Sequence, residues 1–303
     1  MSDNFKKIDE IRVGNSLGEG VQWRAYDQSF WWTDILENKL YQYEWPSKNL
    51  SQFDVPEPLG SFAFTDDPEV IIAAFASGLA FFNWKNGAIK WLHKPEFLAG
   101  EDRFNDGRVD RQGRFWSGTM IAFPRQPNSA SGRLFCLDID YRLSVHEQGV
   151  AISNGIGWSP DGKLLYYADS LTGNIYRYDV DPCTGAISNK SLFVRVPRGG
   201  RPDGAAVDAQ GNVWSAQWAA GKILTFNPGG DIISDIPVPT SQPTCVAFGG
   251  PDLNLMIVTS ARDGLPREQL EKEPAAGNVF IFQTGATGLP EETYKGHVPN
   301  LHT

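Results

Sequence analysis

A short pattern recurs along the chain: Asn or Asp, then Gly, an apolar stretch, and a turn that contains Gly or Asp. Three clear copies are "RFNDGRVDRQGRFWSGTM", "SNGIGWSPDGKLLYYAD" and "RPDGAAVDAQGNVWSAQW". In each copy an apolar residue follows about four places on and a turn residue about eight places on, so the copies align at a fixed register. Five aligned copies start at Glu19, Asn105, Asn154, Asp203 and Thr244.

The number of copies predicts the architecture. A weaker copy, "SFAFTDDPEVIIAAF", fits between the first two, and each copy leads into a second turn and strand such as "GNIYRYDVD". Repeats at a period of about 40 to 50 residues are typical of propeller blades. We therefore predict an all-β, six-bladed β-propeller that occupies residues 1–303 as one domain with short N-terminal and C-terminal tails. A β-sandwich with coincidental spacing is the alternative.

Composition agrees with an all-β chain. The 303 residues include ten Trp, many Phe and Tyr, and frequent Gly and Pro, without long runs of strong helix formers. The stretch "REQLEKEP" is the exception, and it predicts a short solvated helix or loop near the mouth of the channel.

Charge and cysteine content exclude several classes of partner. A net charge of −9 argues against nucleic acid, whose binding needs clustered Lys and Arg. Neither a signal peptide nor an apolar run of about 20 residues is apparent, so we expect no membrane partner and a cytoplasmic protein. Cys136, Cys183 and Cys245 are too scattered for a disulfide scaffold or a thiolate metal site. Both a monomer and a homodimer remain open.

The aligned register predicts a ring of polar side chains. Glu19, Asn105, Asn154 and Asp203 would lie just before the innermost strands of four blades, around one mouth of the central channel. Ordinary Asn-Gly and Asp-Gly turns explain any single copy, but they explain the Glu less well because Glu is a poor turn former. We expect the neighbouring glycines to let the backbone turn so that the polar side chains face the axis. These glycines are Gly20, Gly107, Gly155 and Gly204.

Such a ring has the chemistry of a metal site. Two gathered carboxylates repel each other unless a cation joins them or one of them stays protonated. Oxygen-only donors suit Ca²⁺, Mg²⁺ or Mn²⁺, and Zn²⁺ also accepts carboxylates. The visible donors leave positions open for water and substrate, which is typical of a catalytic metal. Arg103 would either reach into the mouth to hold a polar substrate or be a solvated surface residue.

Five segments resemble, in order and spacing, those of the regucalcin and gluconolactonase family. The resemblance extends from about residue 17 to residue 282, and its segments are "LGEGVQW", "RFNDGRVDRQGRFWSGTM", "SNGIGWSPDGKLLYYADS", "RPDGAAVDAQGNVW" and "PTCVAFGGPDLNLMIVTSAR". It implies a propeller with one catalytic divalent cation that hydrolyses lactones of sugar acids. By this resemblance Glu19, Asn154 and Asp203 bind the metal, while Arg103 and Asn105 hold the sugar hydroxyls. Ca²⁺ is the first expectation, and Asp203 is our candidate for the residue that takes a proton from the attacking water.

The chain departs from the family pattern at two places. Val21 replaces the usual Pro of the opening motif, which loosens a turn without removing a ligand. Ile121, Ala122 and Phe123 follow "GTM", where some members carry a Glu that contacts substrate, so hydroxyl recognition on that side must differ. The particular sugar therefore stays open.

Two other functions fit the same scaffold. One is hydrolysis of aryl esters or phosphotriesters, since a fold alone does not settle function. The other is a non-catalytic calcium-binding propeller, which would not need Arg103 and Asn105.

Overall fold

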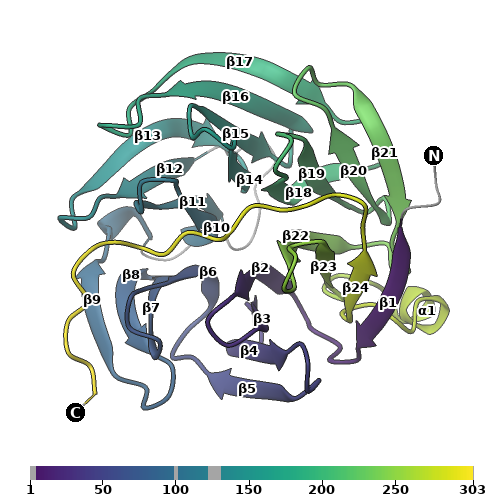
Figure 1. The fold of residues 1–303 in the computed structure, drawn as a ribbon, viewed down its shortest axis with the longest axis horizontal. Helices are drawn as coiled ribbons and strands as arrows, with labels where there is room; N and C mark the ends of the chain where they lie inside the picture. Colours follow the sequence, from purple (N-terminus) through teal and green to yellow (C-terminus); the bar gives the residue numbers. More distant parts are fainter. Residues whose placement is uncertain (1–4, 99–101, 122–130, 303) are drawn as a thin grey trace.

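The structure, a computed structural model, describes residues 5–98, 102–121 and 131–302. Within these residues, six four-stranded antiparallel sheets are arranged around a central axis (Figure 1). The prediction of an all-β, six-bladed propeller is confirmed. Each blade has one strand at the axis and its other three strands progressively further out.

The first three blades follow one another in chain order. Blade 1 contains β2 (Gly18–Arg24), β3 (Ser29–Asp34), β4 (Lys39–Glu44) and β5 (Leu50–Asp54). Blade 2 contains β6 (Leu59–Phe64), β7 (Val70–Phe75), β8 (Gly78–Asn83) and β9 (Ile89–His93). A 3₁₀ turn, η1 (Glu96–Leu98), precedes blade 3. Blade 3 contains β10 (Asp102–Val109), β11 (Phe115–Ile121), β12 (Gly132–Leu137) and β13 (Leu143–Val150).

The remaining blades complete the ring. Blade 4 contains β14 (Ser153–Trp158), β15 (Leu164–Asp169), β16 (Asn174–Val180) and β17 (Ile187–Arg195). Blade 5 contains β18 (Arg201–Val207), β19 (Val213–Trp218), β20 (Lys222–Phe226) and β21 (Ile232–Pro237). Blade 6 contains β22 (Pro243–Gly249), β23 (Leu255–Ser260), β24 (Val279–Gln283) and β1 (Lys6–Ile11).

Blade 6 is built from both ends of the chain. Strand β1 pairs antiparallel with β24 and supplies the outermost strand, so residues 6–11 are part of a blade rather than a tail. This pairing closes the ring and covers an edge of β24 that would otherwise present unpaired backbone groups.

Burial decreases from the axis outward. The inner strands β2, β6 and β14 are buried along their whole length, because the side chains on both faces pack against neighbouring blades. The outer strand β5 alternates between exposed and half-buried positions. Hydrophobic clusters therefore lie between successive blades; one of them joins Trp31 of blade 1 to Phe62 of blade 2.

In blades 3 and 5 a buried aspartate explains the second half of the repeat. Asp110 Oδ2 accepts hydrogen bonds from Trp116 Nε1 at 2.9 Å and from Arg114 Nε at 2.6 Å. In blade 5, Asp208 Oδ2 accepts one from Trp214 Nε1 at the same distance of 2.9 Å. Each aspartate ties the turn after an innermost strand to the next strand of its blade. The spacing from Asp to Gly to Trp is thus a requirement of the local turn.

The segment after β24 crosses the propeller from blade 6 toward blade 2 (Figure 1, yellow). Glu291 in this segment forms an ion pair of 2.6 Å with Arg108 near the end of β10, and both side chains are largely buried. Tyr294 is fully buried against blades 2 and 3. The segment therefore covers the end of the channel opposite to the starts of the innermost strands.

The loop between β23 and β24 contains α1 (Arg267–Lys272), in agreement with the predicted short helix. None of its residues is buried, and it lies at the outer edge beside β1 rather than at the channel mouth (Figure 1). Within the described residues no helix has the length and apolar character needed to span a bilayer.

Tyr294→Ala is expected to lower the free energy of unfolding by about 3–5 kcal/mol, the usual cost of removing a buried aromatic side chain. The Tyr294 backbone N–H donates to the Phe64 carbonyl at 2.8 Å, and its hydroxyl donates to the Asp138 carbonyl at 2.7 Å. Tyr294→Phe keeps the ring and should cost only about 1 kcal/mol. Denaturant unfolding measures both variants, and equal stability of Tyr294→Ala and wild type would contradict a packed C-terminal segment.

Candidate functional site

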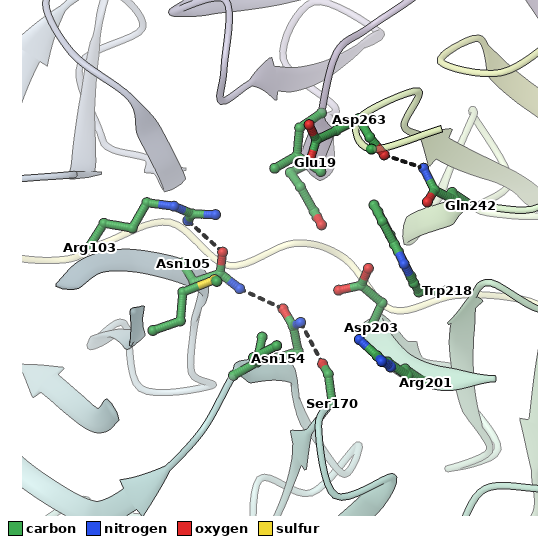
Figure 2. A pocket seen from close by; sticks show the side chains of 14 residues that line it. Glu19, Arg103, Asn105, Asn154, Ser170, Arg201, Asp203, Trp218, Gln242 and Asp263 are labelled. Carbon is green, nitrogen blue, oxygen red and sulfur yellow. Dashed lines mark hydrogen bonds between the residues drawn. The ribbon is translucent and has the colours of Figure 1, made fainter. Parts of the chain in front are cut away.

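A pocket of about 500 Å³ opens at the mouth of the channel where the innermost strands begin. All five residues singled out from the sequence line it: Glu19, Arg103, Asn105, Asn154 and Asp203. They come from the starts of β2, β10, β14 and β18, which belong to four different blades. Figure 2 shows the carboxylates of Glu19 and Asp203 and the amide oxygen of Asn154 directed toward one central space.

A local break in strand pairing directs these side chains to the axis. In each of the four strands the register shifts by one residue, so that two residues face one residue of the partner strand. Such bulges re-aim side chains and are frequent beside active sites. Glu19 and Asn154 are the last paired residues before their bulges, whereas Asn105 and Asp203 are the first residues inside theirs. The expectation of one equivalent position in all four blades was therefore wrong: the residues occupy two adjacent positions.

The neighbouring glycines are required for two different reasons. Gly20 and Gly155 have φ values of 60° and 58°, in the left-handed region that L side chains rarely adopt. Gly107 and Gly204 do not have positive φ, so the expectation of a tight turn was wrong for them. They are needed for close packing, because a Cβ on Gly107 would lie 2.4 Å from Ser61 Oγ and one on Gly204 would lie 2.6 Å from Cys245 Sγ.

A one-directional chain of hydrogen bonds runs around the pocket (Figure 2). Arg103 donates to Asn105 Oδ1 at 2.6 Å, and Asn105 Nδ2 donates to Asn154 Oδ1 at 2.9 Å. Asn154 Nδ2 then donates to Ser170 Oγ at 2.8 Å. Ser170 Oγ donates to the carbonyl of Pro202 at 2.6 Å, directly before Asp203.

The direction of this chain determines which atoms face the pocket. A guanidinium only donates and a carbonyl only accepts, so each amide between them has a single consistent orientation. The Asn154 oxygen is held on the pocket side and keeps a second lone pair for a ligand. Ser170 is 5% exposed and holds the opposite end of the amide. The sequence analysis missed Ser170, because a Ser that follows a strand has no distinguishing local pattern.

Burial and two neighbouring carboxylates act on the pKa of Glu19. Burial first, and then the charges of Asp203 and Asp106, raise the pKa of Glu19 well above its ordinary value. Burial likewise raises the pKa of Asp106. A divalent cation relieves this repulsion. The described residues contain no group of three or more His, Cys, Asp or Glu that could hold a metal ion. Glu19, Asp203 and Asn154 offer two carboxylates and one amide oxygen to the pocket. This oxygen-only set fits a hard divalent cation.

Asp106 is a second residue that the sequence analysis missed. Its Oδ1 accepts from its neighbour Gly107 N at 2.9 Å, and its Oδ2 accepts from Ile156 N at 3.2 Å in the next blade. Ile156 lies inside the bulge that follows Asn154. Asp106 therefore satisfies backbone groups that the bulge leaves without a strand partner. The signal was present in "RFNDG", where an acid follows the predicted Asn.

The walls of the pocket differ in character. Leu17, Met120 and Ile152 are apolar lining residues, whereas Arg201 and the half-buried Trp218 line it from blade 5. Of the residues after "GTM", Ile121 ends β11, while Ala122 and Phe123 lie outside the described residues. Different hydroxyl recognition on that side stays a prediction.

Ser170→Ala is expected to weaken metal binding about tenfold or more, since loss of a group that orients a metal ligand commonly has this effect. The Asn154 amide would lose the acceptor that fixes its rotation. Titration calorimetry of metal-free protein with Ca²⁺ measures the change. The exposed Ser188→Ala is the matched control, and unchanged affinity in Ser170→Ala would contradict the orienting role.

Comparison with known proteins agrees with the fold. The family described as "SMP-30/Gluconolactonase/LRE-like region" matches residues 17–262. The chain is 36% identical to a 6-deoxy-6-sulfogluconolactonase of Pseudomonas putida, over 98% of this chain and 100% of that protein. It is also 36% identical to an L-arabinolactonase of Azospirillum brasilense, over 93% of each.

A solved structure has the same fold over nearly the whole chain. Regucalcin of Agrobacterium tumefaciens, described as a calcium-binding protein, superposes with a TM-score of 0.89 at 27% identity. The superposition covers 95% of this chain and 97% of that one. The chain therefore belongs to the SMP-30/gluconolactonase/LRE-like family.

Proposed function

We propose that this protein is a metal-dependent lactone hydrolase that opens an aldonolactone, with a five- or six-membered ring, to the sugar acid. One observation carries the proposal: three potential metal ligands and two potential hydroxyl ligands, from four blades, line a single pocket. The two lactonases among the relatives support the class of reaction, the hydrolysis of a cyclic carboxylic ester. The chain would act as one six-bladed propeller.

Glu19, Asn154 and Asp203 would hold the cation. Their oxygens point into the same space, and the mutual repulsion of the buried carboxylates favours a positive charge there. Ca²⁺ is our first choice, supported by the calcium-binding description of the regucalcin structure, with Zn²⁺, Mn²⁺ and Mg²⁺ as alternatives. When bound, the cation would polarise the lactone carbonyl and offset negative charge on its oxygen.

Asp203 would act as the general base. Its carboxylate accepts a proton from water as the water oxygen bonds to the carbonyl carbon. The tetrahedral intermediate then collapses with cleavage of the bond to the ring oxygen. The proton moves to that oxygen, so the products are a carboxylic acid and a free hydroxyl. Water and lactone are the only reactants.

Arg103 and Asn105 would position the lactone by its hydroxyls. The two side chains are already hydrogen-bonded to each other, and Asn105 also donates to the Ser153 carbonyl at 2.9 Å. Asn105 is therefore oriented before substrate arrives, which lowers the entropy lost on binding. Truncation of either side chain should mainly raise KM.

Acid release from pentono- and hexonolactones, compared with aryl esters and phosphotriesters, tests the proposal. We expect metal-dependent lactone turnover well above spontaneous hydrolysis. Faster turnover of phosphotriesters or aryl esters would replace it with another ester hydrolase. A folded protein that binds Ca²⁺ and turns over none of these substrates would indicate a binding role.

A further inference from the structure

Arg201 stands out among the groups that line the pocket. It is an exposed residue at the first position of β18, beside Asp203 in Figure 2. Its guanidinium makes no hydrogen bond or ion pair with any other described residue, whereas Arg103 donates to Asn105 and to the Phe104 carbonyl. Arg201 thus brings to the pocket a positive charge that no described residue pairs with.

The position of Arg201 relative to the other groups limits what it contacts. Arg103 and Asn105 lie on one side of the pocket and Arg201 lies on the other, with Asn154 and Asp203 between them (Figure 2). Under the proposed function, on which this inference rests, the lactone carbonyl is held near the middle and the ring hydroxyls lie toward Arg103. Arg201 then faces the part of the substrate that lies away from the hydroxyls held by Arg103 and Asn105.

Trp218 lies on the same wall of the pocket as Arg201. It is the direct cross-strand partner of Arg201 in the pairing of β18 with β19, so both side chains stand on the same face of the blade. Both line the pocket. The half-buried indole therefore contributes apolar surface to the same wall of the pocket as the guanidinium.

The balance of charge favours an anion. A bound divalent cation would offset Glu19 and Asp203. The charged side chains that remain among the described residues of the pocket lining are Arg103, Arg201 and Asp263. Asp263 lies across the pocket from Arg201 (Figure 2). These three side chains leave one net positive charge in the pocket. One negative charge on the substrate, on the side of Arg201, would balance it.

We infer that Arg201 determines specificity by binding an anionic oxygen group on the terminal carbon of the lactone, a sulfonate, phosphate or carboxylate. A guanidinium presents paired N–H donors that match two oxygens of such a group. A neutral hexonolactone or pentonolactone would lack this contact and would bind more weakly.

The experiment compares matched neutral and anionic lactones. The first pair is D-glucono-1,5-lactone and its 6-deoxy-6-sulfo derivative, and the second is D-glucono-1,4-lactone and D-glucaro-1,4-lactone, which has a carboxylate on the terminal carbon. A third comparison uses 6-phospho-D-glucono-1,5-lactone. We expect wild type to favour the anionic member by kcat/KM, and the three series rank sulfonate, carboxylate and phosphate.

Arg201→Gln should lower kcat/KM for the preferred anionic lactone about 10- to 100-fold, mainly through KM, and change the neutral lactones by less than about threefold. Arg201→Lys, which keeps the positive charge but lacks the paired N–H donors of the guanidinium, should recover part of the loss. Arg12→Gln is the control for a general change of charge, since Arg12 has a side chain that is 85% exposed.

Two outcomes would overturn the inference while leaving the proposed function intact. One is an equal effect of Arg201→Gln on neutral and anionic lactones, and the other is a wild-type preference for the neutral members. Failure of wild type to hydrolyse any lactone would instead overturn the proposed function. In that case calorimetry with 6-deoxy-6-sulfogluconate and gluconate still decides the matter: tighter, Arg201-dependent binding of the sulfonate supports the anion site, and equal binding excludes it.

Discussion

Asp203→Asn is expected to lower kcat about a thousandfold or more, because an amide of the same shape cannot accept the proton of the attacking water. Asp203 is only 6% exposed, so bulk water has little access to take over as the proton acceptor. Initial rates of acid release at saturating lactone and saturating Ca²⁺ measure the effect. Saturating metal matters because Asp203 is also a proposed ligand.

The control for this variant is Asp235→Asn. Asp235 lies on the outer strand β21, where its exposed carboxylate pairs with Lys222 at 2.8 Å. It should leave kcat unchanged. If Asp203→Asn regained wild-type kcat once metal was saturating, Asp203 would be a ligand only and another group would have to accept the proton.

Removal of metal by a chelator is expected to lower activity about a thousandfold, since a bound cation contributes several kcal/mol to stabilisation of the transition-state charge. Resupply of Ca²⁺ should restore the rate. The same treatment should lower Tm, because a ligand that binds only the folded state stabilises it by about 2.7 kcal/mol at a hundredfold excess over Kd.

Glu19→Gln gives a sharper test of the charge argument. In metal-free protein it should raise Tm above that of wild type, because it removes one of the buried, mutually repelling carboxylates. With Ca²⁺ present the order should reverse, because the variant loses a charged ligand. Thermal unfolding of both proteins with and without Ca²⁺ measures this. The same order of Tm in both conditions would contradict a cation site between Glu19 and Asp203.

The blades could be predicted from the sequence because their turns require particular residues at a fixed spacing. Asp110 and Asp208 each bind the Trp of the following strand, so every copy with this turn needs the same residues at the same spacing. Period and blade number follow from such repeated local turns. The five candidate site residues were found from the aligned starts of the copies, together with the family resemblance.

Interactions between blades left no such pattern. Asp106 of blade 3 accepts a hydrogen bond from a backbone N–H of blade 4. Ser170 accepts a hydrogen bond from Asn154 and donates one to the residue before Asp203 in blade 5. The role proposed for Arg201 depends on its position beside Trp218 in the lining of the pocket. Each of these roles depends on which residues of another blade lie within hydrogen-bond distance.

The sequence by itself determined the all-β class, the six blades and the residue types around the channel mouth, since each depends on periodicity and on turns a few residues long. Only the tertiary structure decided that β1 completes blade 6 and that the C-terminal segment covers the other end of the channel. It also decided that Asn105 and Asp203 lie one bulge position beyond Glu19 and Asn154. The physical reason is that strand register and ring closure are determined by contacts between segments far apart in the chain, which leave no periodic mark on the sequence.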